Sequence, residues 1–131
     1  MAEPVKRLSD AELEIMRVLW DAGGPMPSTQ VRERLHGKRP WALSTLMTVL
    51  ERLSEKGFVR CDRSTRTNLY EPTITEGEYK AREGRTVLEK LYGNSLKNLV
   101  ASLYEEEAVG EKEILELRQY LEQLKEGRQP C

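Results

Sequence analysis

Residues Trp41 to Pro72 read WALSTLMTVLERLSEKGFVRCDRSTRTNLYEP, and this stretch decides the fold. After Pro40, apolar side chains recur at spacings of three and four, which predicts a helix over residues 42–55 that ends before Lys56 and Gly57. The buried positions of this helix are Leu43, Leu46, Val49, Leu50 and Leu53. The opposite face carries Ser44, Thr45, Met47, Thr48, Glu51 and Arg52. Most of these side chains are short, so the helix can enter a DNA major groove, which is about 12 Å wide.

A short β-hairpin is predicted to follow this helix. Residues 58–59 and 68–70 have strand composition, and the polar residues 62–67 between them include Arg63 and Arg66. Arginines at a hairpin tip suit phosphate oxygens or a narrow minor groove, although charged tips are also common because tips are solvated. A polar-faced helix followed by a basic hairpin is the order of a recognition helix and a wing.

Two further helices are predicted before this stretch. A Ser-x-x-Glu capping box at residues 9–12 predicts a helix that begins at Asp10 and ends before Gly23-Gly24-Pro25. Ser28 is expected to cap a second helix that runs through Leu35. Helix, helix, helix and hairpin in this order predict a winged helix-turn-helix.

The C-terminal half indicates three short amphipathic helices. A Thr-x-x-Glu capping box at Thr75 begins the first, and Gly93-Asn94-Ser95 ends it. Segments of about fifty residues rarely bury enough apolar surface to be stable alone, so the apolar stripes are expected to pack against a second copy of the chain. The alternative is that they pack back on the N-terminal domain. The predicted dimerisation residues are Leu88, Leu91, Leu96, Leu99, Leu103, Ile114, Leu117, Leu121 and Leu124.

These patterns predict a mainly α fold with a small β-hairpin. The expected organisation is a winged helix-turn-helix DNA-binding domain at residues 1–74, a C-terminal helical dimerisation region at 75–127 and a disordered tail at 128–131. No apolar run is long enough to span a bilayer, and the N-terminus lacks a signal-peptide core, so a cytoplasmic location is expected.

Charge is unevenly distributed along the chain. The whole sequence has a formal net charge of -1. Residues 32–66 hold nine basic and four acidic side chains, a net charge of +5, whereas residues 73–131 hold nine basic and twelve acidic side chains. The basic excess therefore coincides with the predicted recognition helix and wing, where it would attract a polyanion such as DNA.

The sequence also resembles a known family. The pattern Leu8-Ser9-x-Ala11-Glu12-x-x-Ile15-Met16-x-x-Leu19-Trp20, followed by Trp41-x-x-Ser44-Thr45-x-x-Thr48-x-Leu50-x-Arg52-Leu53-x-x-Lys56-Gly57-Phe58 and Tyr70-x-Pro72, is similar to that of the BlaI/MecI/CopY (penicillinase repressor) family of bacterial transcription regulators. The resemblance covers roughly residues 8–125. It implies a homodimeric repressor that binds a palindromic operator in double-stranded DNA through one winged helix per subunit, until an inducing signal removes it.

The resemblance also implies particular functional residues. It places Ser44, Thr45, Met47 and Thr48 at the major groove, and Arg63 and Arg66 in the wing. Arg52 of the same helix, and Lys38 and Trp41 before it, are also expected to contact the DNA. Penicillinase repressors of this type are cleaved when a membrane sensor peptidase is triggered. The position that matches the family's Asn-Phe cleavage site is Ser102-Leu103 here, so the residues differ.

Catalysis and metal binding are not expected. Cys61 and Cys131 are the only thiols and His36 is the only imidazole, so no cluster has metal-ligand spacing and no group supplies a nucleophile with its base. Copper-responsive family members carry paired cysteines near the C-terminus, whereas this chain has only Cys131 there. No cofactor is expected. The alternative function is a winged-helix module that binds another protein without operator binding, and such binding would depend little on salt.

Overall fold

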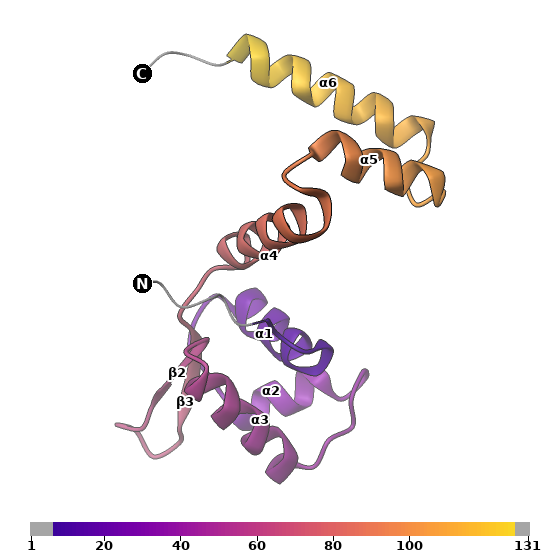
Figure 1. Cartoon of the computed structure of the whole chain (residues 1–131). Coiled ribbons are helices and arrows are strands. Elements are labelled where there is room, and N and C mark those ends of the chain that lie inside the picture. The colour runs from indigo at the N-terminus through magenta and orange to yellow at the C-terminus, as the bar shows by residue number, and fades with distance from the viewer. Residues whose placement is uncertain (1–6, 128–131) are drawn as a thin grey trace. The chain divides into compact units, whose positions relative to one another are not determined.

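The computed structural model describes residues 7–127 (Figure 1). Its elements in chain order are α1 (Asp10–Ala22), β1 (Met26–Pro27), α2 (Ser28–Leu35), α3 (Leu43–Glu55), β2 (Val59–Asp62), β3 (Leu69–Pro72), α4 (Glu76–Tyr92), α5 (Leu96–Glu105) and α6 (Glu111–Gly127). The tail predicted at residues 128–131 lies outside the described residues, as does Cys131. No helix among residues 7–127 is long and apolar enough to cross a membrane.

The chain divides into two compact units, Met1–Glu83 and Gly84–Cys131. From the sequence, the domain boundary was predicted after residue 74, before α4. The structure places it inside α4, because Tyr79 in the first turns of that helix is buried with the first unit. Its ring centroid lies 5.9 Å from that of Phe58 and 6.1 Å from that of Trp20, and its hydroxyl accepts a hydrogen bond from the Leu8 N–H at 3.0 Å.

The first unit is a three-helix core with a three-stranded antiparallel sheet in the order β1-β3-β2. The hairpin register pairs Val59 with Pro72 and Asp62 with Leu69. The predicted hairpin is therefore present, whereas β1 was not predicted. Two residues that include a proline carry no alternating pattern, so only pairing with β3, Met26 opposite Tyr70, reveals this strand.

Helix ends follow local signals at most positions. α1 begins at Asp10 with the Ser9–Glu12 capping box in place, and Gly23 ends it with a left-handed φ of 75°. The expected cap at Ser28 was wrong, because Pro27 occupies the N-cap position and Ser28 is the buried first residue of α2. The extended φ and ψ of Pro27, -73° and 154°, continue β1 directly into the helix without a side-chain cap.

The core of the first unit is drawn from all three of its helices. α1 contacts α2 and β3, while α3 contacts α2 and β2, so the three helices and the sheet share one interior. The residues with less than 2% relative exposure are Glu12, Ile15, Met16, Leu19, Val31, Leu35, Leu46, Leu50 and Leu53. The three leucines of α3 fix which face of that helix turns outward.

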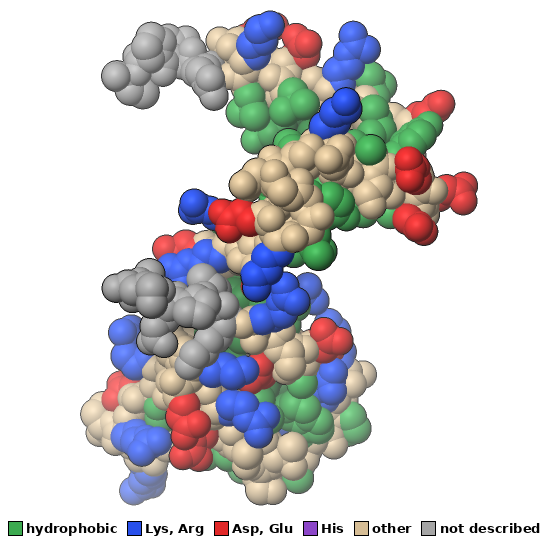
Figure 2. Space-filling view, viewed as in Figure 1, with side chains coloured by type: hydrophobic (Ala, Val, Ile, Leu, Met, Phe, Trp, Pro, Cys, Tyr) green, Lys and Arg blue, Asp and Glu red, His purple; other side chains and the backbone are tan. Residues whose placement is uncertain are grey.

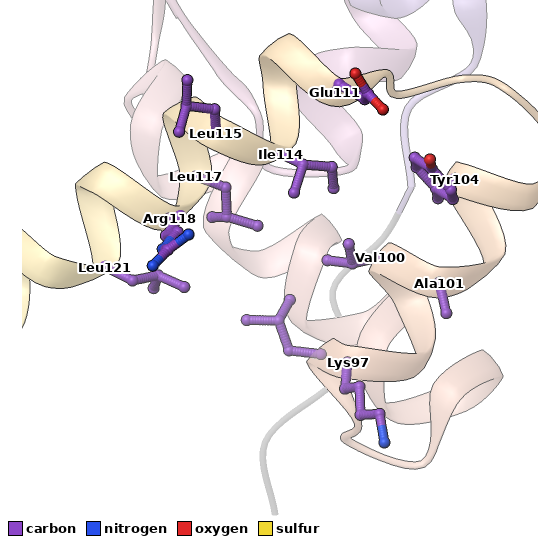
Figure 3. A pocket seen from close by; sticks show the side chains of 11 residues that line it. Lys97, Val100, Ala101, Tyr104, Glu111, Ile114, Leu115, Leu117, Arg118 and Leu121 are labelled. Atoms are coloured by element: carbon purple, nitrogen blue, oxygen red, sulfur yellow. The ribbon is translucent and has the colours of Figure 1, made fainter.

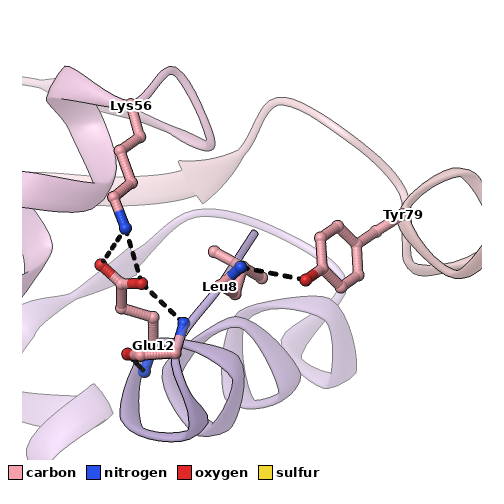
Figure 4. A network of polar contacts seen from close by, with 5 residues as sticks. Leu8, Glu12, Lys56 and Tyr79 are labelled. Atoms are coloured by element: carbon pink, nitrogen blue, oxygen red, sulfur yellow. Dashed lines mark hydrogen bonds and ion pairs between the residues drawn. The ribbon is translucent and has the colours of Figure 1, made fainter. Parts of the chain in front are cut away.

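One charged residue in this core, Glu12, joins α1 to α3 (Figure 4). Lys56 Nζ lies 2.8 and 2.9 Å from the two carboxylate oxygens of Glu12, and the Ser9 N–H donates to Glu12 Oε1 at 2.8 Å. Burial by itself raises the pKa of Glu12, but the hydrogen bonds and charge of Lys56, together with those from Ser9, outweigh it, so the pKa is lowered. The C-terminal end of α3 is thereby held against the first turn of α1.

Candidate nucleic-acid interface

The outward face of α3 is polar and accessible. Ser44, Thr45, Thr48 and Arg52 are exposed, because the opposite face is anchored in the core. The Thr48 hydroxyl donates to the Ser44 carbonyl oxygen at 3.1 Å, which leaves its oxygen lone pairs free to accept from an outside donor. The hydroxyls predicted for base contact therefore lie together on one side of the helix.

Met47 differs from the other predicted residues of α3. It is half-buried, and the Tyr70 hydroxyl of β3 donates to its sulfur at 3.9 Å. Burial raises the pKa of Tyr70, and its contact with Cys61 raises it further, so the hydroxyl stays protonated as the donor. Met47 thus lies at the junction of α3 and the hairpin, where it fixes the two parts relative to each other within the first unit.

The loop before α3 is held by two arginines. The Arg39 guanidinium carbon lies 5.6 Å from the centre of the Trp41 ring, and Arg39 also pairs with Glu14 of α1. Arg32 Nε donates to the Trp41 carbonyl oxygen at 3.2 Å. Trp41 is therefore half-buried and fixed at the entrance to α3, whereas the neighbouring Lys38 is exposed.

The hairpin tip carries both predicted wing arginines. Arg63 and Arg66 are exposed, and Lys and Arg side chains stand at the end of the β2–β3 hairpin in Figure 2. The turn is built by Asp62, whose Oδ1 accepts from the Ser64 N–H at 2.9 Å. Contact with the side chain of Cys61 raises the pKa of Arg63, a guanidinium that is charged at working pH in any case.

The free positive charge is smaller than the sequence count indicated. Lys56 pairs with Glu12, Arg39 with Glu14, and Arg60 with Glu71 on the opposite strand. All three acidic partners lie outside residues 32–66, so a count within that segment misses them. Of the six basic side chains left over, Arg32 and Arg34 lie on α2. The other four, Lys38, Arg52, Arg63 and Arg66, lie in the loop before α3, on α3 and at the hairpin tip.

A second surface lies wholly in the C-terminal unit. α5 and α6 enclose an apolar groove of about 740 Å³, into which Ile114, Leu117 and Leu121 of α6 point toward Val100 of α5 (Figure 3). The large hydrophobic side chains that are exposed among residues 7–127 all come from this unit. They are Leu91, Leu96, Tyr104, Leu115, Tyr120, Leu121 and Leu124. Of the predicted dimerisation residues, Leu88, Leu99, Leu103, Ile114 and Leu117 are half-buried.

No group of three His, Cys, Asp or Glu side chains that could hold a metal is present among the described residues. His36 is exposed at the C-cap of α2, and its N–H donates to the Glu33 carbonyl oxygen. Cys61 is half-buried in β2.

Comparison with known proteins places this architecture in a family. Residues 8–123 match the family model described as penicillinase repressor. The chain belongs to the penicillinase repressor family. It is 31% identical to the penicillinase repressor of Bacillus licheniformis over 92% of this chain and 94% of that protein. It is 27% identical to the methicillin resistance regulatory protein MecI of Mammaliicoccus sciuri over 87% and 92% of the two chains.

A solved structure agrees with the fold of the first unit. The solution structure of the DNA-binding domain of the repressor BlaI matches with a TM-score of 0.50 and 33% identity, covering 60% of this chain and 94% of that domain. The predicted winged-helix fold, the family resemblance and the assignment to transcription regulators rather than enzymes are thereby confirmed.

Three residues that support the interface were not predicted from the sequence. Glu14 and Arg39 position the loop before α3, and Tyr70 positions Met47. Arg39 next to Pro40 and Trp41 was a usable signal, since arginine commonly stacks on an aromatic ring. Glu14 and Tyr70 gave no such signal, because their partners are distant in the sequence.

Proposed function

We propose that this member of the penicillinase repressor family is a sequence-specific DNA-binding repressor that acts in the cytoplasm as a homodimer on a palindromic operator. α3 would lie in the major groove, and the hairpin tip with Arg63 and Arg66 would contact the backbone or the minor groove. The observation that carries the proposal is the outward face of α3, whose exposed hydroxyls include Thr48, and Thr48 lines the same depression as the exposed wing residue Arg63.

Division of labour within the interface follows from chemistry. Ser44, Thr45 and Thr48 offer hydroxyl donors and acceptors to base edges, so they would specify sequence. Arg52 and the wing arginines carry charge at exposed positions and would bind phosphates, which gives affinity without sequence information. Likeness to the DNA-binding domain of BlaI supports this use of the first unit.

The homodimer part of the proposal rests on the C-terminal unit. Tyr104 and Leu121 line the apolar groove and are 50% and 46% exposed in the single chain, and Leu91 is 72% exposed. A surface with this many large apolar side chains marks an interaction site. A second copy of the same unit supplies a matching apolar surface by two-fold symmetry, and it would bring two reading helices onto two half-sites.

We further propose that a membrane sensor peptidase is a partner of this protein, as the family resemblance implies. Ser102 and Leu103 are half-buried and lie inside α5, so cleavage between them would require this helix to unwind. Cleavage can be tested by measuring the mass of the chain recovered from cells before and after repression is relieved. Two separate fragments, one ending at Ser102 and the other beginning at Leu103, would support it. An intact chain in both states would contradict it.

A footprint on the DNA upstream of the protein's own gene tests the repressor proposal. The expected result is a protected site with two-fold symmetry whose half-site centres lie one helical turn or a multiple of it apart, since dimers of this fold bind on one side of the duplex. Binding should also weaken steeply with salt because phosphate contacts release counterions. A uniform footprint with no preferred site would contradict the proposal, and salt-independent binding to another protein would favour the interaction module instead.

A further inference from the structure

One acidic side chain lies among the residues proposed to read DNA. Glu51 is exposed on α3, three residues after Thr48, four after Met47 and seven after Ser44, so it lies on the same outward stripe of the helix. Among residues 7–127 its carboxylate makes no ion pair. Glu12, Glu14 and Glu71 of the same unit, by contrast, are each neutralised by a basic partner.

Glu51 lies on the side of α3 that faces the hairpin. Glu51 and Arg63 line the same depression of about 370 Å³ between α3 and the hairpin, together with Thr48 and Tyr70. The charge of Glu51 contributes to the raised pKa of Arg63, after the larger contributions from Cys61 and Tyr70. A cation from the hairpin and an anion from the reading helix therefore line one depression without forming an ion pair.

An unpaired carboxylate on a DNA-binding face has two physical consequences. It repels phosphates, so it lowers affinity for DNA of every sequence. It also accepts hydrogen bonds only, and the groups on base edges of the major groove that can satisfy it are exocyclic amines, of which cytosine N4 is the usual partner of Glu and Asp. The repulsion is offset only where such an amine is placed against the carboxylate.

We propose that Glu51 is a specificity-determining residue, which accepts a hydrogen bond from the N4 amino group of a cytosine in the operator and disfavours DNA that lacks this base. The inference rests on the proposed function, because it requires α3 to lie in the major groove. Arg63 beside it would bind a neighbouring phosphate and hold the carboxylate against the base rather than against the backbone.

The experiment selects binding sites from a randomised duplex pool with the wild-type protein and three variants. Glu51→Ala removes the carboxylate, Glu51→Gln replaces it with an amide, and Glu55→Ala removes an exposed carboxylate one turn further along the same helix. Glu55 lines the same depression, so its removal changes the charge equally and serves as the matched control. Both positions are exposed on the surface, and unchanged thermal unfolding checks that each of the three variants is folded.

The proposal predicts that Glu51→Ala loses selection at one C·G pair by roughly fivefold or more, while the preference at the other positions is kept. Its affinity for random DNA should rise, and its salt dependence should steepen by about one charge. Glu51→Gln should shift the preference at this pair toward adenine, the usual partner of glutamine. Glu55→Ala should also raise affinity for random DNA but keep the C·G preference.

Two results would overturn the inference. Glu51→Ala could select the same sequence as the wild type, or Glu55→Ala could lose the same C·G preference, which would reduce the effect to general electrostatics. Failure of the repressor proposal looks different, because the wild-type protein itself would then select no sequence from the pool.

Discussion

Replacing Lys56 with Met should destabilise the first unit by about 2–3 kcal/mol at pH 7, because it leaves the buried carboxylate of Glu12 without its cation. Glu12 is 2% exposed, so without rearrangement of the fold water does not take the place of the ammonium group. The remaining donor to its carboxylate is the Ser9 N–H. The C-terminal end of α3 would also lose its tie to α1.

The size of the effect follows from protonation. A buried carboxylate without a partner takes up a proton, and from the ordinary pKa of 4.5 this costs about 3.4 kcal/mol at pH 7, at 1.36 kcal/mol per pKa unit. Loss of the wild-type stabilisation from the lowered pKa adds to this figure, whereas local rearrangement that hydrates Glu12 reduces it. Adding Glu12→Gln to Lys56→Met removes both charges and keeps an acceptor for Ser9, so the double variant should recover much of the lost stability.

The stability difference between the wild type and Lys56→Met should depend on pH. In the wild type the pKa of Glu12 is lowered, so its contribution to stability is fully present above pH 4.5 and is lost as the pH falls through the folded-state pKa. In Lys56→Met the same carboxyl has a raised pKa, so acidification stabilises the variant relative to the wild type. The free energies of unfolding of the two proteins should therefore converge as the pH falls from 7 toward 4.5.

Urea unfolding followed by helical circular dichroism measures these quantities, with the protomer concentration held fixed because a dimer's stability depends on it. Lys80→Met is the matched control. Lys80 is exposed and pairs with Glu76 at 3.4 Å on the surface of α4, so its loss should change stability by at most about 0.5 kcal/mol. A Lys56→Met variant as stable as this control, or one whose deficit does not shrink on acidification, would refute the reasoning.

Two further predictions concern the wing and the dimer. Changing Arg63 and Arg66 together to Ala should weaken binding to operator and random DNA alike and flatten the salt dependence by up to about two charges, as measured by titration at several salt concentrations; an unchanged slope would remove the wing from the interface. Changing Leu117 and Leu121 together to Asp should yield monomers in sedimentation and a collapse of operator affinity, because each charge in an apolar interface costs about 1–3 kcal/mol or more. Gln119→Asp, exposed on the same helix, should remain a dimer.

The elements that could be predicted are those whose signals are local. The Ser9–Glu12 capping box set the first residue of α1, and the apolar spacing from Leu43 to Leu53 set the helix that became α3. The hairpin followed from its strand composition and its polar tip. In each case the residues that determine the element are within a few positions of one another.

The features that could not be predicted depend on partners far apart in the chain. β1 exists only because Met26 pairs with Tyr70. In the sequence Lys56 has the position of an ordinary helix-ending cation, and only the fold brings it beside Glu12. The sequence count of free positive charge on the predicted interface was too high for the same reason. Family resemblance named the functional residues, but it did not indicate that Met47 is held by Tyr70.

The central claim is that the outward hydroxyls of α3 read DNA sequence, and competition binding of operator against random DNA tests it most directly. Thr45→Ala and Thr48→Ala should each reduce the binding free-energy difference between operator and random DNA by about 1–3 kcal/mol for every essential base contact. Thermal stability should stay nearly unchanged because both side chains are exposed. Thr29→Ala, exposed on α2, should leave that free-energy difference as it is in the wild type. Full discrimination in both α3 variants would contradict the assignment of α3 as the reading helix.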